Sequence, residues 1–331
     1  MKSINKNFKK SNFFDIRSKY IIMQIFYHLN TTTWLSMIKY NKIIKNKLDI
    51  TLNDLLNIEI DLYPKENIYD EFININKNNK YFHIYFNNDK KEIKRNILTK
   101  EDNVNKIRII IDNNVNNFEK LFNECKYIKK ISFIKFIRNN ITNMRYMFNN
   151  CKSLEELNFL NFNTKNVKYM DGMFYNCSSL KEINLSNFNT ENVIDMSFMF
   201  HGCSSLKELD LSNFNGKNLT YIDNIFSQCN SLKKLNLKNF YIDKPTETDY
   251  MFFICSSLET LDLSNLHIKK VLQMPCMFSG CTKLKELDLS NLKTIFGVDL
   301  HHIFEDCKSL KKIKCSDFSI NFKRKNICLI C

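Results

Sequence analysis

Eight cysteines follow one another at a constant spacing of 26 residues, and thiols in such a series could bind metal, form disulfides or fill a core. The series is Cys125, Cys151, Cys177, Cys203, Cys229, Cys255, Cys281 and Cys307. A phenylalanine lies three residues before each cysteine, and an isoleucine or leucine lies three residues after it. A fixed period of this length, without insertions, predicts one supersecondary unit per repeat, stacked into a solenoid.

The spacing argues against disulfides and against a metal centre. Equivalent residues in adjacent coils stack ~4.8 Å apart, whereas a disulfide needs Cβ atoms ~3.8 Å apart. Each cysteine has the same neighbours on both sides, so nothing selects pairs, and no histidine recurs at a fixed ligand position. We therefore predict buried free thiols that pack as small hydrophobic side chains, with no metal and no cofactor.

Each repeat is predicted to contain two secondary-structure elements. Met170, Met173, Phe174 and Cys177 have the i, i+3, i+4, i+7 spacing that predicts one face of a short helix. The pattern that runs from Leu206 through Leu209 and Leu211 predicts a strand. The expected fold class is α/β, a solenoid of eight 26-residue units over residues 106–318 with the helices packed behind a parallel sheet.

The repeat resembles a known family. The unit Met-x-x-Met-Phe-x-x-Cys-x-Ser-Leu-x-x-Leu-x-Leu-Ser-Asn-Phe-x-Thr is similar to the BspA-like leucine-rich-repeat family over residues 118 to about 318. That family is known from bacterial surface proteins and from anaerobic protists, and the resemblance implies a non-catalytic solenoid that binds proteins or matrix.

The chain departs from the commonest leucine-rich pattern at the turn after each strand. Phenylalanine occupies the usual position of the ladder asparagine, and asparagine lies one residue earlier. These phenylalanines and asparagines are Phe162, Phe188, Phe214 and Phe240, and Asn161, Asn187, Asn213, Asn239, Asn265 and Asn291. Whether these amides bridge neighbouring coils is open at this point.

Residues 1–105 are predicted to form a separate and mainly helical N-terminal region. Residues 21–29 have helical spacing, and two further short helices are expected up to residue 48. Alternation predicts strands at 81–86 and 106–111, the second as an edge strand that caps the sheet. Two interpretations stay open: a solenoid cap, or an F-box-like module, because residues 22–29 weakly resemble that family's first helix without its Leu-Pro start.

A candidate binding face follows from the strand pattern. The x positions of Leu-x-x-Leu-x-Leu should point to solvent on the concave side of the sheet, where they form acidic and basic columns. The acidic candidates for partner binding are Glu156, Glu182, Glu208, Asp210, Asp262, Glu286 and Asp288. We expect a protein partner here, of unknown identity.

The tail, residues 319–331, resembles a lipidation signal. Cys328-Leu329-Ile330-Cys331 reads as a C-a-a-X box, and Lys323, Arg324 and Lys325 form a basic patch before it. A lipid chain plus a basic patch is what stable anchoring requires. We therefore expect prenylation of Cys328 and attachment to the cytoplasmic face of a membrane, the plasma membrane first, with a cytosolic protein as the alternative. Residues 1–20 contain no secretion signal.

The motif inventory does not suggest an enzyme. The sequence lacks a glycine-rich phosphate loop, Gly-x-Ser-x-Gly and His-Glu-x-x-His, so we expect no catalytic residues and no small-molecule substrate. The net charge of +14 favours an anionic partner, and without a nucleic-acid-binding signature we expect a membrane surface rather than nucleic acid. Three hypotheses remain: a membrane-tethered scaffold, an F-box-type adaptor of a ubiquitin ligase, and a surface adhesin that binds host or matrix protein.

Overall fold

The computed structural model describes residues 56–66, 69–75, 79–159, 162–242, 246–263, 266, 268–290, 292–294, 299–314 and 328–330. The chain divides into two compact units, Met1–Asn57 and Ile58–Cys331. Strands within residues 58–105 therefore belong to the same unit as the repeats. The helices predicted up to residue 48, and the F-box-like motif with them, lie outside the described residues.

The second unit consists of strands and turns. In chain order its elements are β1 (Ile58–Pro64), η2 (Asn79–Tyr81), β2 (Phe82–Phe86), β3 (Glu92–Ile93), β4 (Ile107–Ile111), β5 (Ile128–Lys135), β6 (Glu156–Asn158), β7 (Glu208–Asp210), β8 (Lys234–Asn236), β9 (Thr246–Glu247), β10 (Thr260–Leu261), β11 (Ile268–Gln273), β12 (Glu286–Asp288), β13 (Leu292–Thr294), β14 (Lys312–Lys314) and β15 (Cys328–Ile330). Its sheets have the strand orders β3-β2-β4-β1-β5-β6, β10-β12-β14-β15, β13-β11-β9 and β7-β8.

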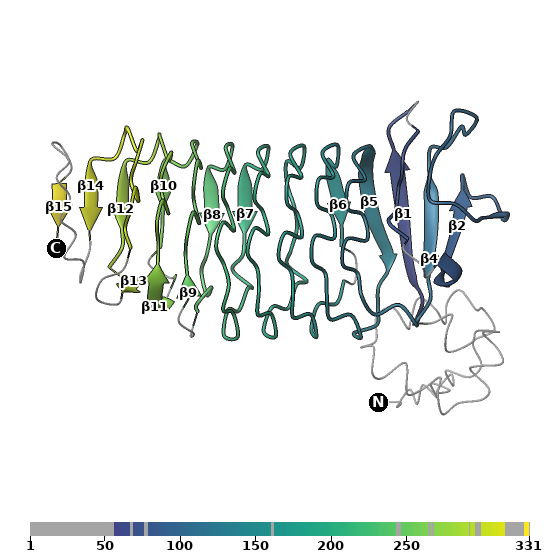
Figure 1. The fold of residues 1–331 in the computed structure, drawn as a ribbon, viewed down its shortest axis with the longest axis horizontal. Helices are drawn as coiled ribbons and strands as arrows, with labels where there is room; N and C mark the ends of the chain where they lie inside the picture. The colour runs from purple at the N-terminus through teal and green to yellow at the C-terminus, as the bar shows by residue number, and fades with distance from the viewer. Residues whose placement is uncertain are drawn as a thin grey trace, which may run out of the picture. The chain divides into compact units, whose positions relative to one another are not determined.

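The predicted solenoid is confirmed. Figure 1 shows the coils stacked in chain order from β5 to β14. β7 pairs with β8 in parallel, and the register matches Leu209 with Leu235, one repeat later. A second row of parallel bridges runs along the opposite side of the coils, for example from Tyr169 to Asp195 and from Asp195 to Tyr221. Each repeat is therefore one coil.

The predicted short helices are wrong, and the α/β class with them, because η2 is the only helix among the described elements. The segment from Met170 to Cys177 forms consecutive turns. Its N–H groups alternate: Met173 donates to Met170 O, three residues back, whereas Phe174 donates to Met199 O in the next coil. Gly172 and Asn176 have φ of 58° and 55°, and left-handed residues at this spacing interrupt an α-helix.

The core has the composition that the sequence predicts. The repeat phenylalanines form a stack through the coils; the rings of Phe148 and Phe174 are 5.6 Å apart with an interplanar angle of 2°. Met173, Cys177 and Leu180 are fully buried beside this stack. The burial is continuous from coil to coil, so each repeat completes its core with its neighbours.

The asparagines after the strands do bridge neighbouring coils. Asn213 Nδ2 donates to Leu185 O at 3.0 Å and to Phe188 O at 2.8 Å, and Asn239 Nδ2 donates to Ser212 O at 3.1 Å. A second asparagine column, which the sequence reasoning missed, does the same: Asn192 Nδ2 donates to Lys165 O at 2.8 Å. These amides satisfy carbonyl groups at the coil corners.

An antiparallel sheet covers the first coil, and no helix does so among the described residues. β1 pairs with β5, the first strand of the solenoid, and with β4 on its other side. The strand predicted at 81–86 is confirmed as β2. The expectation of an edge strand at 106–111 is wrong, because β4 lies between β1 and β2. Pairing with β1 protects the otherwise open edge of β5.

Candidate functional site

We call the exposed side of strands β6, β7, β8, β10, β12 and β14, together with residues 181–184 of the coil between β6 and β7, the strand face. Two shallow concavities lie along it. The first, about 740 Å³, extends over four coils and is lined by Glu182, Glu208, Asp210 and Asp262 with their lysine neighbours. The second, about 330 Å³, is lined by Asp262, Glu286 and Asp288. Six of the seven predicted binding residues therefore meet in two adjoining hollows.

The seventh predicted residue, Glu156, lies on β6, where it pairs with Lys130 at 2.5 Å. Similar ion pairs connect successive coils of the strand face: Lys234 Nζ lies 2.7 Å from Glu208 Oε1. The side chains of that pair are 75% and 64% exposed. Ion pairs this exposed contribute about 0–1 kcal/mol to stability. The stability of the fold therefore does not explain why these charged side chains are present.

The aspartate column of the strand face has a structural role that the sequence reasoning did not assign. Asp210 Oδ1 accepts the N–H of Ser212 at 2.8 Å, and Asp288 Oδ1 accepts the N–H of Ser290 at 2.9 Å. Hydrogen bonds from the Ser290 hydroxyl and backbone N–H lower the pKa of Asp288 to about 2. These carboxylates cap the turn after the strand. The glutamate column is thus the better candidate for partner contact.

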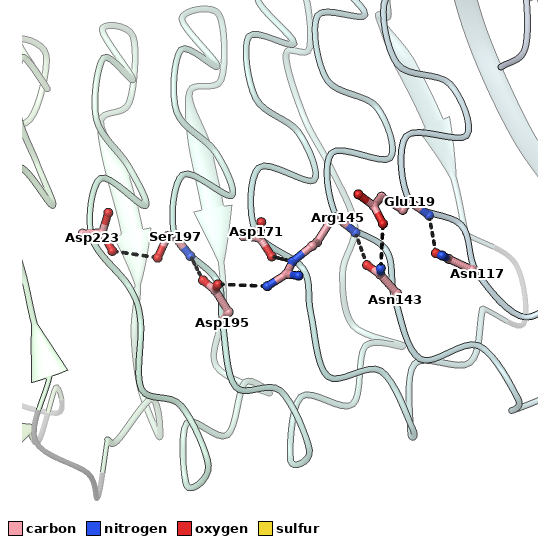
Figure 2. A network of polar contacts seen from close by, with 8 residues as sticks. All are labelled: Asn117, Glu119, Asn143, Arg145, Asp171, Asp195, Ser197 and Asp223. Atoms are coloured by element: carbon pink, nitrogen blue, oxygen red, sulfur yellow. Dashed lines mark hydrogen bonds and ion pairs between the residues drawn. The ribbon is translucent and has the colours of Figure 1, made fainter. Parts of the chain in front are cut away.

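A second polar surface lies on the opposite side of the coils, and the sequence analysis missed it. We call it the turn face and define it by the side chains eight and six positions before each repeat cysteine. Figure 2 shows a chain of contacts along it, through Asn117, Glu119, Asn143, Arg145, Asp171, Asp195, Ser197 and Asp223. Only the 26-residue register of these positions could have pointed to it.

Arg145 is the centre of this network. Its Nε donates to Asp171 Oδ1 at 2.6 Å, and its Nη2 lies 3.6 Å from Asp195 Oδ2 (Figure 2). Its guanidinium carbon lies 4.1 Å from the centre of the Tyr169 ring, which adds a cation–π contact. Burial raises the pKa of Asp171, although the hydrogen bond from Arg145 opposes this effect. The arginine therefore balances the negative charge of two partly buried carboxylates.

Further along the turn face, carboxylate side chains occupy successive coils. Asp223 accepts the Ser197 hydroxyl at 2.7 Å. Asp249 follows one coil later, and its buried Oδ1 has no hydrogen-bond partner. Burial, together with the charges of Glu247, Asp223 and Asp299, raises the pKa of Asp249 to about 6. The two rows of the turn face contain acidic but no basic side chains from Asp195 to Asp299.

The repeat cysteines are free thiols, as predicted, and all eight are buried. Burial raises the pKa of Cys229 to about 12, which keeps this thiol protonated. Within the described ranges, no three His, Cys, Asp or Glu side chains lie close enough together to hold a metal ion. Cys315 and Cys331 lie outside those ranges.

The tail contributes one described segment. β15, which contains Cys328, pairs in parallel with β14 and extends the sheet by one strand. The basic residues 323–325 lie outside the described part of the chain. No helix in the described part is long and apolar enough to cross a membrane.

The fold and these surfaces define the class: a repeat solenoid with polar faces on both sides of its coils. Residues 95–209, 155–261 and 224–323 match the family described as "Mycoplasma protein of unknown function, DUF285". Together these overlapping matches cover more than half of the chain, which therefore belongs to this family.

Other comparisons add little to this assignment. A search of curated proteins found no match. Among solved structures, the chain is similar to a leucine-rich repeat protein from Bacteroides ovatus ATCC 8483, with 21% identity and a TM-score of 0.33. That similarity covers 65% of this chain and 61% of the other, so the chain spans less than two thirds of that protein's length.

Proposed function

We propose that the protein is a non-catalytic, leucine-rich-repeat scaffold of the BspA-like type that binds a partner protein on its strand face. The observation that carries this proposal is the concavity of about 740 Å³ over four coils. Its charged side chains extend from a rigid stack and contribute little to folding. Charged side chains that the stacked coils hold at a regular spacing can select a partner by charge complementarity.

Binding of the partner protein should depend on the glutamates of the strand face. We expect the double substitution Glu182→Lys/Glu208→Lys to remove specific partners recovered by proximity labelling in cells. Glu101→Lys, an exposed position in a turn between β3 and β4, is the control with the same change of charge at one site. Unchanged partner profiles for the double variant, with circular dichroism showing an intact fold, would contradict the strand face as the binding surface.

Membrane tethering through Cys328 is the finer part of this proposal. It rests on the C-a-a-X-like residues and on the basic residues 323–325. A prenyltransferase must bind these last residues itself, so β15 would have to leave β14 during modification. The intact mass of the native carboxy-terminal peptide tests both the modification and the position of the carboxyl terminus. An unmodified peptide that ends at Cys331 would leave a soluble scaffold.

A further inference from the structure

Three exposed lysines follow one another in successive coils at the strand face. Lys181, Lys207 and Lys233 each lie four residues after a repeat cysteine, and we call them the lysine column. The column is in register, because the N–H of Lys207 donates to Lys181 O at 3.4 Å and the N–H of Lys233 donates to Lys207 O at 2.8 Å. None of the three lysines forms an ion pair with another residue in the described ranges.

The coils on either side have acidic residues at the same position. Glu155 occupies it one coil before Lys181, and Glu259, in the coil after the column, pairs with Lys285 of the following coil at 2.8 Å. Lys207 instead has a lysine on both sides, and like charges opposite one another in neighbouring strands are unfavourable. The lysine column is therefore unfavourable for the fold by itself, and an acidic ligand would relieve the repulsion.

The lysine column shares its hollow with the glutamate column. The first concavity is lined by the three lysines, by Glu182 and Glu208 of the glutamate column, and by the partly exposed Ile183 and Leu235. In all, four basic and four acidic side chains line this concavity. A uniformly charged polymer, such as a nucleic acid, would meet like charges there as well as opposite ones, and this repulsion disfavours it.

We propose that the partner protein contributes an extended segment of alternating charge, with acidic side chains over the lysine column and basic side chains over the glutamate column. An extended chain has its side chains alternately on two opposite sides, so one segment that runs along the coils can meet both columns. Side chains on one side are ~6.7 Å apart, and two of them fit within the ~9.6 Å from Lys181 to Lys233. This inference rests on the function proposed above, because it describes the partner of the same surface.

The test compares two fluorescein-labelled peptides of about twelve residues with the same composition. One alternates single Glu and Lys residues, and the other alternates Glu-Glu and Lys-Lys pairs, which places both charges on each side of an extended chain. Fluorescence anisotropy with the full-length reduced protein should give a dissociation constant on the order of 100 µM for the first peptide and at least about fivefold weaker binding for the second. Equal affinities, or no binding of either peptide up to about 1 mM, would overturn the inference.

Substitutions in the protein test the lysine column itself. Lys207→Glu should weaken binding of the first peptide at least about fivefold, because it places a carboxylate against the acidic side of the segment. Lys217→Glu is the matched control, an exposed site in the same coil outside the concavity, and should change affinity by less than about twofold. Lys181→Glu/Lys233→Glu should act like Lys207→Glu and is the second variant if Lys207→Glu alters the circular dichroism spectrum. Equal effects of the column variants and the control would overturn the column as the contact.

Two further outcomes would also overturn the inference, each in its own way. Loss of partners from Glu182→Lys/Glu208→Lys in cells, without any preference for the first peptide, would reject the alternating segment and leave the proposed function standing. Single-stranded oligodeoxythymidine that binds more tightly than the first peptide, and loses affinity with Lys207→Glu, would assign the column to a nucleic acid instead of a protein segment.

Discussion

The thiol of Cys203 donates to the carbonyl oxygen of Phe174 in the preceding coil, at an Sγ–O distance of 3.2 Å. The same contact recurs in every later coil, for example from Cys229 to Phe200 O at 3.2 Å. Each cysteine thus does more than fill space, because it donates a hydrogen bond to a buried carbonyl between coils. Cys125, which has no preceding coil, reaches only Asn123 O in its own coil, at 3.9 Å.

Cys203→Ala should lower the free energy of unfolding by about 1–2 kcal/mol, because it creates a small cavity and removes the contact with Phe174 O. Cys125→Ala is the control, since it leaves a similar cavity without breaking a bond between coils. Urea unfolding of both variants under reducing conditions measures the difference. Equal losses would show that the thiol contact between coils contributes nothing to stability.

The buried thiols should resist alkylation in the native protein. A variant with Cys276, Cys315, Cys328 and Cys331 changed to serine retains only the eight repeat cysteines of the twelve in the chain. Iodoacetamide should leave the native variant unlabelled and label all eight thiols in denaturant, because burial both shields them and raises their pKa. Intact mass gives the count, and native labelling within minutes would contradict a closed core.

Gly172→Ala should strongly destabilise the protein. Its φ is 58°, and an added Cβ would lie 2.2 Å from the Tyr146 ring. We expect a loss above about 2 kcal/mol in the native background and only about 1–2 kcal/mol, the left-handed penalty, in a Tyr146→Ala background. Chemical denaturation of all four proteins completes this double-mutant cycle. Additive losses would mean that the ring moves away at no cost.

Asp249 should make stability depend on pH in the direction opposite to most carboxylates. Its pKa is raised from 3.8 to about 6, so folding favours its protonated form, and the ionised group destabilises the fold as pH rises from about 4 through 6. Asp249→Asn should therefore stabilise the protein at pH 7, by about 1–2 kcal/mol after allowance for solvent screening, and have little effect at pH 4.

Asp102 provides a control of opposite sign for that measurement. The hydrogen bond from Arg95 lowers its pKa to about 2, so its stabilisation is present above about pH 4 and is lost as pH falls through 2. Asp102→Asn should destabilise the protein at pH 7. Thermal unfolding of both variants across this pH range tests the two signs, and a loss of stability in Asp249→Asn at pH 7 would contradict the prediction.

The glutamate column of the strand face could be predicted because strand side chains alternate and every coil repeats the same phase. Glu182 and Glu208 lie in the concavity that this reasoning implies. Arg145 could not be found in this way. Its partners, Asp171 and Asp195, are 26 and 50 residues away along the chain, and they meet only because the turns stack in register.

The sequence by itself determined the repeat, its length and its buried face, because a fixed 26-residue period repeats the same side chains in every coil. Met170, Met173, Phe174 and Cys177 are buried as expected. Only the tertiary structure decided which carbonyl groups accept the hydrogen bonds of their backbone N–H groups. Helical spacing predicts bonds within the segment, but half of its N–H groups find carbonyls in the next coil, as Phe174 does with Met199 O. Stacked neighbours offer those carbonyls, and left-handed residues such as Gly172 orient the N–H groups toward them.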